Sequence, residues 1–105
     1  MILYAVTMVD IRDGRSATSN CRCVGIFTEF EKAEEHLMDN IADVAEGGTN
    51  KYAVIEELKS NQFYPMCVVK QWYVYDPKPA LDNDGLYWRC EEPEWAQGII
   101  NWGVG

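Results

Sequence analysis

The stretch TEFEKAEEHLMDNIADVAE, from Thr28 to Glu46, decides the fold because it is the one segment of this chain with a clear helical pattern. Its apolar residues recur at steps of three and four, which is the period of a helix that lies on a core. Thr28 and Glu31 have the spacing of a capping box, and Gly47-Gly48 is typical of a helix end. The sequence therefore predicts one amphipathic helix over Thr28–Glu46. Its predicted core stripe is Phe30, Ala33, Leu37, Ile41, Val44 and Ala45.

The segments on both sides of this helix have the composition of strands bounded by turns. The run Ile2–Val9 is apolar throughout, which predicts a strand that is central or covered on both faces. The residues Asp10–Asn20 form a long hairpin connection to the second strand. The five predicted strands are Ile2–Val9, Cys21–Phe27, Lys51–Leu58, Met66–Asp76 and Leu86–Cys90.

This order of elements predicts an α+β fold, with an antiparallel-dominated sheet of four to five strands and one main helix on one face, in ββαββ order. Residues 1–105 are expected to form a single domain, since this length suffices for one hydrophobic core. Pro93 and its acidic neighbours predict a short helical turn near the end of the chain. Ile99, Ile100 and Trp102 are expected to dock on the domain.

In Met66–Asp76, strict alternation would divide the side chains between the two faces of the sheet. One face would carry Val68, Lys70, Trp72 and Val74, and the other Cys67, Val69, Gln71, Tyr73 and Tyr75. Both faces are substantially apolar or aromatic, so one of them must be covered.

The chain is acidic, with seventeen Asp and Glu against nine Lys and Arg and a net charge of −8. This balance argues against electrostatic binding to nucleic acid or to an anionic membrane, and it favours a protein partner with a basic surface. The apolar N-terminal run has no basic segment before it and is too short for a membrane span. We therefore expect a cytoplasmic protein whose four cysteines are reduced.

The outer face of the predicted helix carries four acidic residues at four-residue steps. They are Glu31, Glu35, Asp39 and Asp43. A charge run of this kind is usually a solvated face that keeps a protein in solution. The alternative is a negative ridge that meets the basic surface of a partner.

Aromatic residues are the second candidate for partner contact, and most of them lie in the C-terminal half. Trp72, Tyr73 and Trp88 are the candidate contact residues, because Trp and Tyr dominate binding hot spots. One helix covers only one face of a sheet, so an exposed aromatic face would be a ligand platform or a dimer interface. We accordingly expect a homodimer.

The hairpin before the helix holds the only concentration of basic residues, namely Arg12, Arg15 and Arg22. They are either edge charges that prevent strand pairing with other molecules or an anion-binding site. The second reading gives the alternative function, a small-ligand or nucleotide-binding protein that uses these arginines together with the aromatic sheet residues.

Catalytic and metal-binding motifs are weak throughout the sequence. Cys21, Cys23, Cys67 and Cys90 lack the Cys-x-x-Cys spacing of a zinc knuckle, so packed reduced thiols are expected. His36 has no nucleophile placed by sequence to partner it. The adjacent Glu56 and Glu57 would point to opposite faces of a strand. We predict no catalytic residues, no metal site, no cofactor and no enzymatic activity.

Several segments together resemble small uncharacterised proteins of gut bacteria and their phages. They are Gly25-Ile26-Phe27, Tyr52-Ala53-Val54-Ile55-Glu56-Glu57, Tyr64-Pro65, Trp72-Tyr73 and Asn101-Trp102-Gly103-Val104-Gly105. The resemblance implies no established activity, but it raises the expectation of a mobile-element protein that blocks a larger one. The leading hypothesis is a non-enzymatic, acidic protein-interaction module of this inhibitor type.

Overall fold

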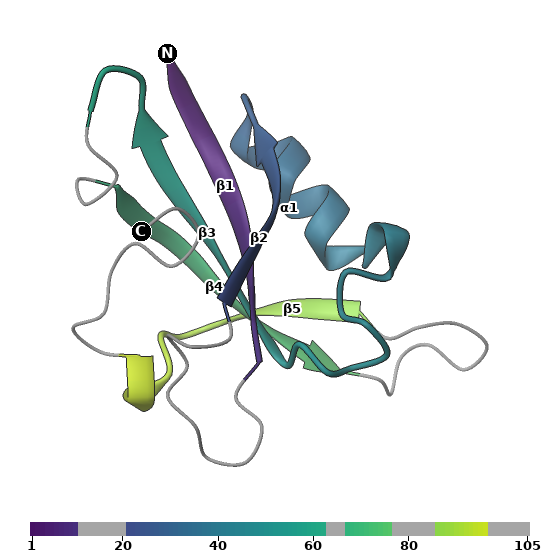
Figure 1. Cartoon of the computed structure of the whole chain (residues 1–105). Helices are drawn as coiled ribbons and strands as arrows, with labels where there is room; N and C mark the ends of the chain where they lie inside the picture. Colours follow the sequence, from purple (N-terminus) through teal and green to yellow (C-terminus); the bar gives the residue numbers. More distant parts are fainter. Residues whose placement is uncertain (11–20, 63–66, 77–85, 97–105) are drawn as a thin grey trace.

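The computed structural model describes residues 1–10, 21–62, 67–76 and 86–96 (Figure 1). Five strands form one antiparallel sheet in the order β2-β1-β3-β4-β5, and the helix α1 (Phe30–Met38) lies on one face of it. The strands are β1 (Ile2–Val9), β2 (Cys21–Phe27), β3 (Tyr52–Lys59), β4 (Val68–Asp76) and β5 (Leu86–Cys90). The predicted α+β class is confirmed. The third strand lies one residue later than predicted, and the fourth begins at Val68 instead of Met66.

β1 has an inner place in the sheet, as its apolar run predicts. It pairs with β2 on one side and with β3 on the other, and residues 5 to 9 are buried. A strand with both faces covered needs apolar side chains at successive positions, not only at alternate ones. The composition of Ile2–Val9 therefore specifies its place between two other strands.

The face of the sheet under α1 forms the larger core. Ala33 and Leu37 of the helix pack on side chains from β1, β3, β4 and β5. The buried residues of this cluster are Val6, Met8, Ala33, Leu37, Ala45, Ala53, Ile55, Tyr73 and Tyr87. The helix is also tied to the sheet by Glu34, which accepts hydrogen bonds from Tyr73 at 2.5 Å and from Arg89 at 2.6 and 2.7 Å.

In the described part of the chain the centre of the opposite face is covered, so the expected exposed aromatic face is limited to the partly exposed Trp88 and Trp95. Val9, Val54 and Trp72 are buried there together with Ala96 of the short 3₁₀ helix η5 (Glu94–Ala96). The short helical turn predicted near Pro93 is thus confirmed. The homodimer stays a prediction. Ile99, Ile100 and Trp102 lie outside the described residues.

β4 carries an irregularity that overturns the predicted division of its side chains. Ile55 of β3 is opposite Gln71, whereas the next residue, Glu56, is opposite Val69. Because a bulge inserts one extra residue, the alternation is reversed on one side of it. Val69 therefore packs with Trp72 on the face away from α1, and not with Tyr73 as predicted.

The predicted helix is much shorter than Thr28–Glu46. It ends at Met38, because Asn40 adopts a left-handed conformation with φ 49° and ψ 44°. Asn is the residue that most often replaces glycine at this position. The predicted capping box is also wrong, since the N-cap residue is Glu29 and no side chain caps the helix. Gly47 and Gly48 have φ of 69° and 96° and turn the chain toward β3.

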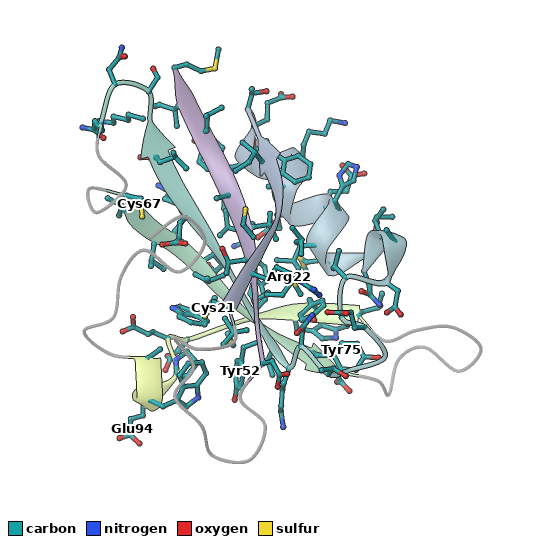
Figure 2. The ribbon with its side chains drawn as sticks, viewed as in Figure 1. Cys21, Arg22, Tyr52, Cys67, Tyr75 and Glu94 are labelled. Carbon is teal, nitrogen blue, oxygen red and sulfur yellow. The ribbon has the colours of Figure 1, made fainter. Side chains whose placement is uncertain are left out.

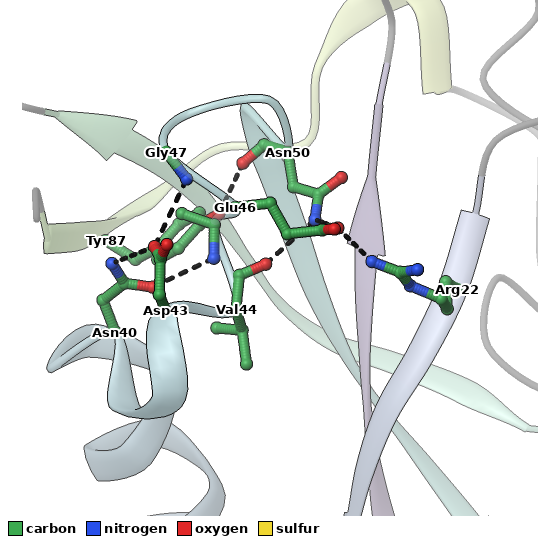
Figure 3. A network of polar contacts seen from close by, with 9 residues as sticks. Arg22, Asn40, Asp43, Val44, Glu46, Gly47, Asn50 and Tyr87 are labelled. Carbon is green, nitrogen blue, oxygen red and sulfur yellow. Dashed lines mark hydrogen bonds and ion pairs between the residues drawn. The ribbon is translucent and has the colours of Figure 1, made fainter.

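The segment from Asn40 to Asn50 is held by side-chain hydrogen bonds together with backbone bonds of the i→i+3 type, and not by an α-helical ladder (Figure 3). Asn40 Oδ1 accepts from the Ala45 amide at 3.0 Å, and Asn40 Nδ2 donates to Asp43 Oδ1 at 3.2 Å. Asn50 Nδ2 donates to the Val44 carbonyl and to Glu46, both at 2.9 Å. These bonds satisfy buried polar groups that the broken helix leaves without intrahelical partners.

Replacing Asn40 by alanine should lower the free energy of unfolding by about 2–3 kcal/mol. The change removes two side-chain hydrogen bonds at a buried site and places an alanine in a left-handed conformation. Asn61, with φ 66°, is exposed and is the matched control. Asn61→Ala should cost less than about 1 kcal/mol, because it changes only the backbone preference. Urea unfolding of both variants measures the difference, and equal losses would show that the hydrogen bonds of Asn40 contribute little.

Candidate functional site

An apolar cavity of about 170 Å³ lies between the edge strand β2 and the helix α1. Its lining comes from the sheet, from one flank of α1 and from the 3₁₀ helix η3 (Ile41–Asp43). The lining residues are Val6, Val24, Gly25, Phe27, Ala33, His36, Leu37, Ile41, Ala42 and Val44. We call this cavity the β2–α1 groove.

The sheet side of the groove depends on an irregularity in β2. Val6 of β1 is opposite Gly25 and the next residue, Thr7, is opposite Cys23, so Val24 has no partner in this register. This extra residue lines the groove and is 38% exposed. At Gly25, an added Cβ would lie 3.1 Å from the ring of Phe27. Glycine therefore lets the Phe27 ring lie close to the strand. The Phe27 ring also packs against the His36 ring, with the ring centroids 5.3 Å apart.

The other side of the groove depends on the end of the helix at Asn40. A continuous helix would have placed Ile41 in the core stripe, as predicted. After the left-handed turn Ile41 is instead 50% exposed at the groove. The next residue, Ala42, has φ 60°, a conformation that an alanine rarely adopts. The prediction of Ile41 as a core residue is therefore wrong.

Three of the four predicted acidic residues form an exposed row on the outer side of α1. Glu31, Glu35 and Asp39 are exposed, and within the described part of the chain none of them forms an ion pair. We call these three residues the acidic ridge. His36, which lines the groove, is one helical turn from Asp39, so Asp39 is the ridge residue nearest the groove.

Asp43, the fourth predicted ridge residue, has a structural role. Its Oδ1 accepts hydrogen bonds from Asn40 Nδ2 at 3.2 Å and from the Gly47 amide at 3.3 Å (Figure 3). It follows the end of the helix, so it is not in line with the other three. The prediction that Asp43 belongs to the ridge is wrong because the helical period stops before it.

Two of the three predicted aromatic contact residues are buried within the chain. Trp72 is 2% exposed on the face away from α1, and Tyr73 is fully buried under α1. Burial and the nearby Glu34 carboxylate both raise the pKa of Tyr73. Neither ring offers a surface to a partner in this fold. Trp88 is the exception, at 46% exposed.

The three arginines do not form one described site. Arg12 and Arg15 lie outside the described residues. Arg22 forms an ion pair with Glu46, which also accepts a hydrogen bond from Asn50 (Figure 3). Arg22 is therefore engaged in holding the segment after the helix against the edge strand.

The cysteines behave as packed thiols where the structure describes their surroundings. Cys67 Sγ donates to Glu56 Oε2 at 3.2 Å, and both side chains are buried. Figure 2 places Cys67 and Cys21 at separate positions on the sheet. Among the described residues no three His, Cys, Asp or Glu side chains are grouped to hold a metal ion. Glu56 lies on the face away from α1, as expected for one of the two adjacent glutamates.

A charged contact between helix and sheet was not found by sequence reasoning. Arg89 of β5 donates through Nε and Nη2 to the two oxygens of Glu34, 55 residues earlier in the chain. These bonds lower the pKa of Glu34, although partial burial opposes the effect. Local spacing in the sequence does not indicate this ion pair, because it depends on how α1 crosses the sheet.

The thiols should react slowly in the folded protein. Burial, with the Glu56 charge second, raises the pKa of Cys21 from 9.0 to about 11, and burial also raises the pKa of Cys23 and of Cys90. At pH 8 the thiolate fraction of Cys21 falls by about 100-fold, and thiolate is the reactive form. We expect reaction with Ellman's reagent to be slow in buffer and fast in guanidinium chloride. A fast-reacting thiol in the folded chain would contradict this prediction.

The Glu34–Arg89 pair should add stability that depends on pH. Because the pKa of Glu34 is lower in the folded than in the unfolded chain, its contribution is present above about pH 4.3 and is lost as the pH falls through the folded value. We expect Glu34→Gln to lose less stability than the wild type between pH 5 and pH 3 in urea unfolding. Glu35→Gln, on the exposed ridge, is the control and should follow the wild type.

No protein-family model matches this chain, and neither the curated proteins nor the solved structures include a significant match.

Proposed function

We propose that this protein is a non-enzymatic protein-interaction module that binds a larger protein through the β2–α1 groove and the acidic ridge. The proposal rests on one observation, which is the combination of an apolar cavity at the surface with a row of exposed carboxylates on the same helix, of which Asp39 lies nearest the cavity. The partner segment that fits this combination carries an apolar side chain for the groove and Lys or Arg residues for the ridge. We further propose that it acts as an inhibitor, as the resemblance to phage and mobile-element proteins implies.

The size of the groove suits a single apolar side chain. An engineered apolar cavity of about 150 Å³ binds benzene, so a cavity of about 170 Å³ has room for one aromatic or branched aliphatic group. Burying such a side chain contributes about 1.5–3 kcal/mol. Val24 and Ile41 lie at the groove with 38% and 50% of their surfaces exposed, and a bound segment would cover them.

The ridge supplies preference for a basic segment more than it supplies affinity. Exposed ion pairs contribute about 0–1 kcal/mol each, but like charges across an interface are disfavoured. The net charge of −8 also attracts basic partners over longer distances and does so less at high salt. Selectivity for basic segments should therefore weaken as salt increases, while the apolar contact in the groove remains.

The chemistry of the described residues supports a non-enzymatic role. The raised pKa values of Cys21, Cys23 and Cys90 are opposite to what activates a cysteine nucleophile. The pair of Glu34 and Arg89 connects the helix to the sheet and lies outside the lining of the groove.

The cellular setting remains part of the proposal. Among the described residues no helix has the length and apolar character that a membrane crossing needs. We propose a cytoplasmic location, where the cysteines would remain reduced. If the chain forms a homodimer, the exposed edges of the sheet are the places for it, since the centre of the face away from α1 is buried.

A peptide-display selection with the purified chain as bait tests the proposal without a known partner. We expect the enriched peptides to share one large aliphatic or aromatic residue with Lys or Arg within a few positions of it. Val24→Asp should abolish enrichment of the peptides that carry the large apolar residue, because it places a charge at the apolar groove. The triple variant E31Q/E35Q/D39Q should retain the apolar residue in the selected peptides but lose the preference for basic ones.

The matched control is E91Q/E92Q/E94Q, which removes the same number of charges far from the groove. This control should leave the enrichment of peptides that combine the large apolar residue with Lys or Arg as it is in the wild type. All variants are checked by circular dichroism and urea unfolding. If the peptides with the large apolar residue are still enriched by a folded Val24→Asp variant, the groove is excluded as their binding site.

A further inference from the structure

A second surface with different chemistry lies at the other edge of the sheet. The sequence WRCEEPEW, residues 88 to 95, begins and ends with tryptophan and has three glutamates between. Trp88 is 46% exposed and Trp95 is 36% exposed, and they have the largest side chains of the exposed apolar residues in the described part of the chain. Exposed tryptophans are uncommon on a surface without a partner, because each exposes a large apolar area.

The alternation of β5 directs Trp88 away from α1. Its neighbours Tyr87 and Arg89 both point to the helix side, since Tyr87 is in the core under α1 and Arg89 binds Glu34. Trp88 must then point to the opposite side. There it is opposite Val74 of β4, which is in turn opposite Tyr52 of β3.

Trp95 is fixed on the same side by two other aromatic rings. Its ring packs edge-to-face on Tyr52, with centroids 5.2 Å apart, and on Trp72, with centroids 5.7 Å apart. Trp72 is buried, so Trp95 is anchored by these two rings while 36% of its surface is exposed. In Figure 2, Glu94 lies with η5 on the opposite side of the molecule from α1. The tryptophan surface and the β2–α1 groove are therefore separate.

The segment between the two tryptophans is negatively charged and has no basic side chain to neutralise it among the described residues. Glu91, Glu92 and Glu94 are exposed, and none of them forms an ion pair in the described part of the structure. Arg89 is the nearest base in sequence, but its guanidinium binds Glu34 on the other face. The Ala96 amide donates a hydrogen bond to the Pro93 carbonyl at 2.9 Å, which fixes the turn that carries Glu94.

We propose that Trp88, Trp95, Glu91, Glu92 and Glu94 form a second docking surface, which binds an arginine-bearing segment of a protein. We call it the tryptophan edge. An indole face attracts a cation through its quadrupole, and a guanidinium can stack on the ring while it pairs with a carboxylate. The negative charge of the glutamates and the faces of the two exposed indoles both favour a cationic side chain. Arginine fits better than lysine, because its planar group stacks and donates in a fork.

This inference does not depend on the proposed function of the groove. The groove is at the β2 edge on the α1 side, whereas the tryptophan edge is at the β5 edge on the other side. A short peptide cannot occupy both. If both surfaces bind, one copy of the protein joins two basic segments, either of one large partner or of two partners.

Fluorine NMR of the chain labelled with 5-fluorotryptophan tests the proposal. Single Trp→Phe variants assign the resonances. The probe is the peptide acetyl-GRGRGRG-amide, and its control replaces each arginine by citrulline, which has nearly the same shape and no charge. We expect the arginine peptide to shift the resonances of Trp88 and Trp95 and to leave that of the buried Trp72 nearly unchanged. The citrulline peptide should shift none of them.

Two variants of equal charge separate a local site from general attraction. E91Q/E92Q/E94Q should weaken binding of the arginine peptide by about tenfold, because each exposed ion pair contributes a factor of a few. E31Q/E35Q/D39Q removes three charges from the ridge and should change the affinity for the arginine peptide by less than about twofold. If the first triple variant does not fold, Glu94→Gln takes its place and should weaken binding by a factor of a few.

Three results would overturn the proposal. Equal weakening by the two triple variants would show attraction by net charge alone. Equal shifts by the citrulline peptide would show apolar contact without recognition of a cation. The absence of shifts at Trp88 and Trp95 would show that the surface does not bind arginine. Val24→Asp, which disables the groove, should leave all these measurements unchanged, so failure of the groove and failure of the tryptophan edge are distinguishable.

Discussion

The left-handed turn at Asn40 is the constraint on which the rest of the structure depends. Its side chain accepts from the Ala45 amide and donates to Asp43, so it stabilises a conformation that would otherwise be unfavourable. With the helix ended there, the following segment returns along the sheet, where Tyr87 donates to the Asn50 carbonyl. The same turn brings Ile41 to the surface and gives the β2–α1 groove its outer wall.

The second organising feature is that both faces of the sheet are covered within one short chain. α1 covers one face, and the region of η5 contributes to the other. Exposed apolar groups lie near both edges of the sheet, with Val24 and Ile41 at one and Trp88 at the other. Exposed carboxylates lie near both edges, which supports the two surfaces proposed for basic partners.

Sequence patterns were most reliable where one local rule determined the structure. Ile2–Val9, Cys21–Phe27 and Leu86–Cys90 are strands with the predicted bounds, because β-favouring residues between turn signals leave few alternatives. The helix end was missed, because the apolar period continues through Ile41 and Val44 and glycine is a stronger stop signal than Asn40. The reversed face of Val69 was missed because a bulge depends on pairing with another strand.

The sequence by itself determined the α+β class, the acidic character and the inner place of Ile2–Val9, since composition and periodicity carry this information locally. Only the tertiary structure decided which candidate contact residues are available. It buried Trp72 and Tyr73, engaged Asp43 and Arg22 in structural bonds, and left Glu31, Glu35, Asp39 and Trp88 exposed. The physical reason is that burial and ion pairing depend on contacts between residues far apart in the chain, which no local pattern records.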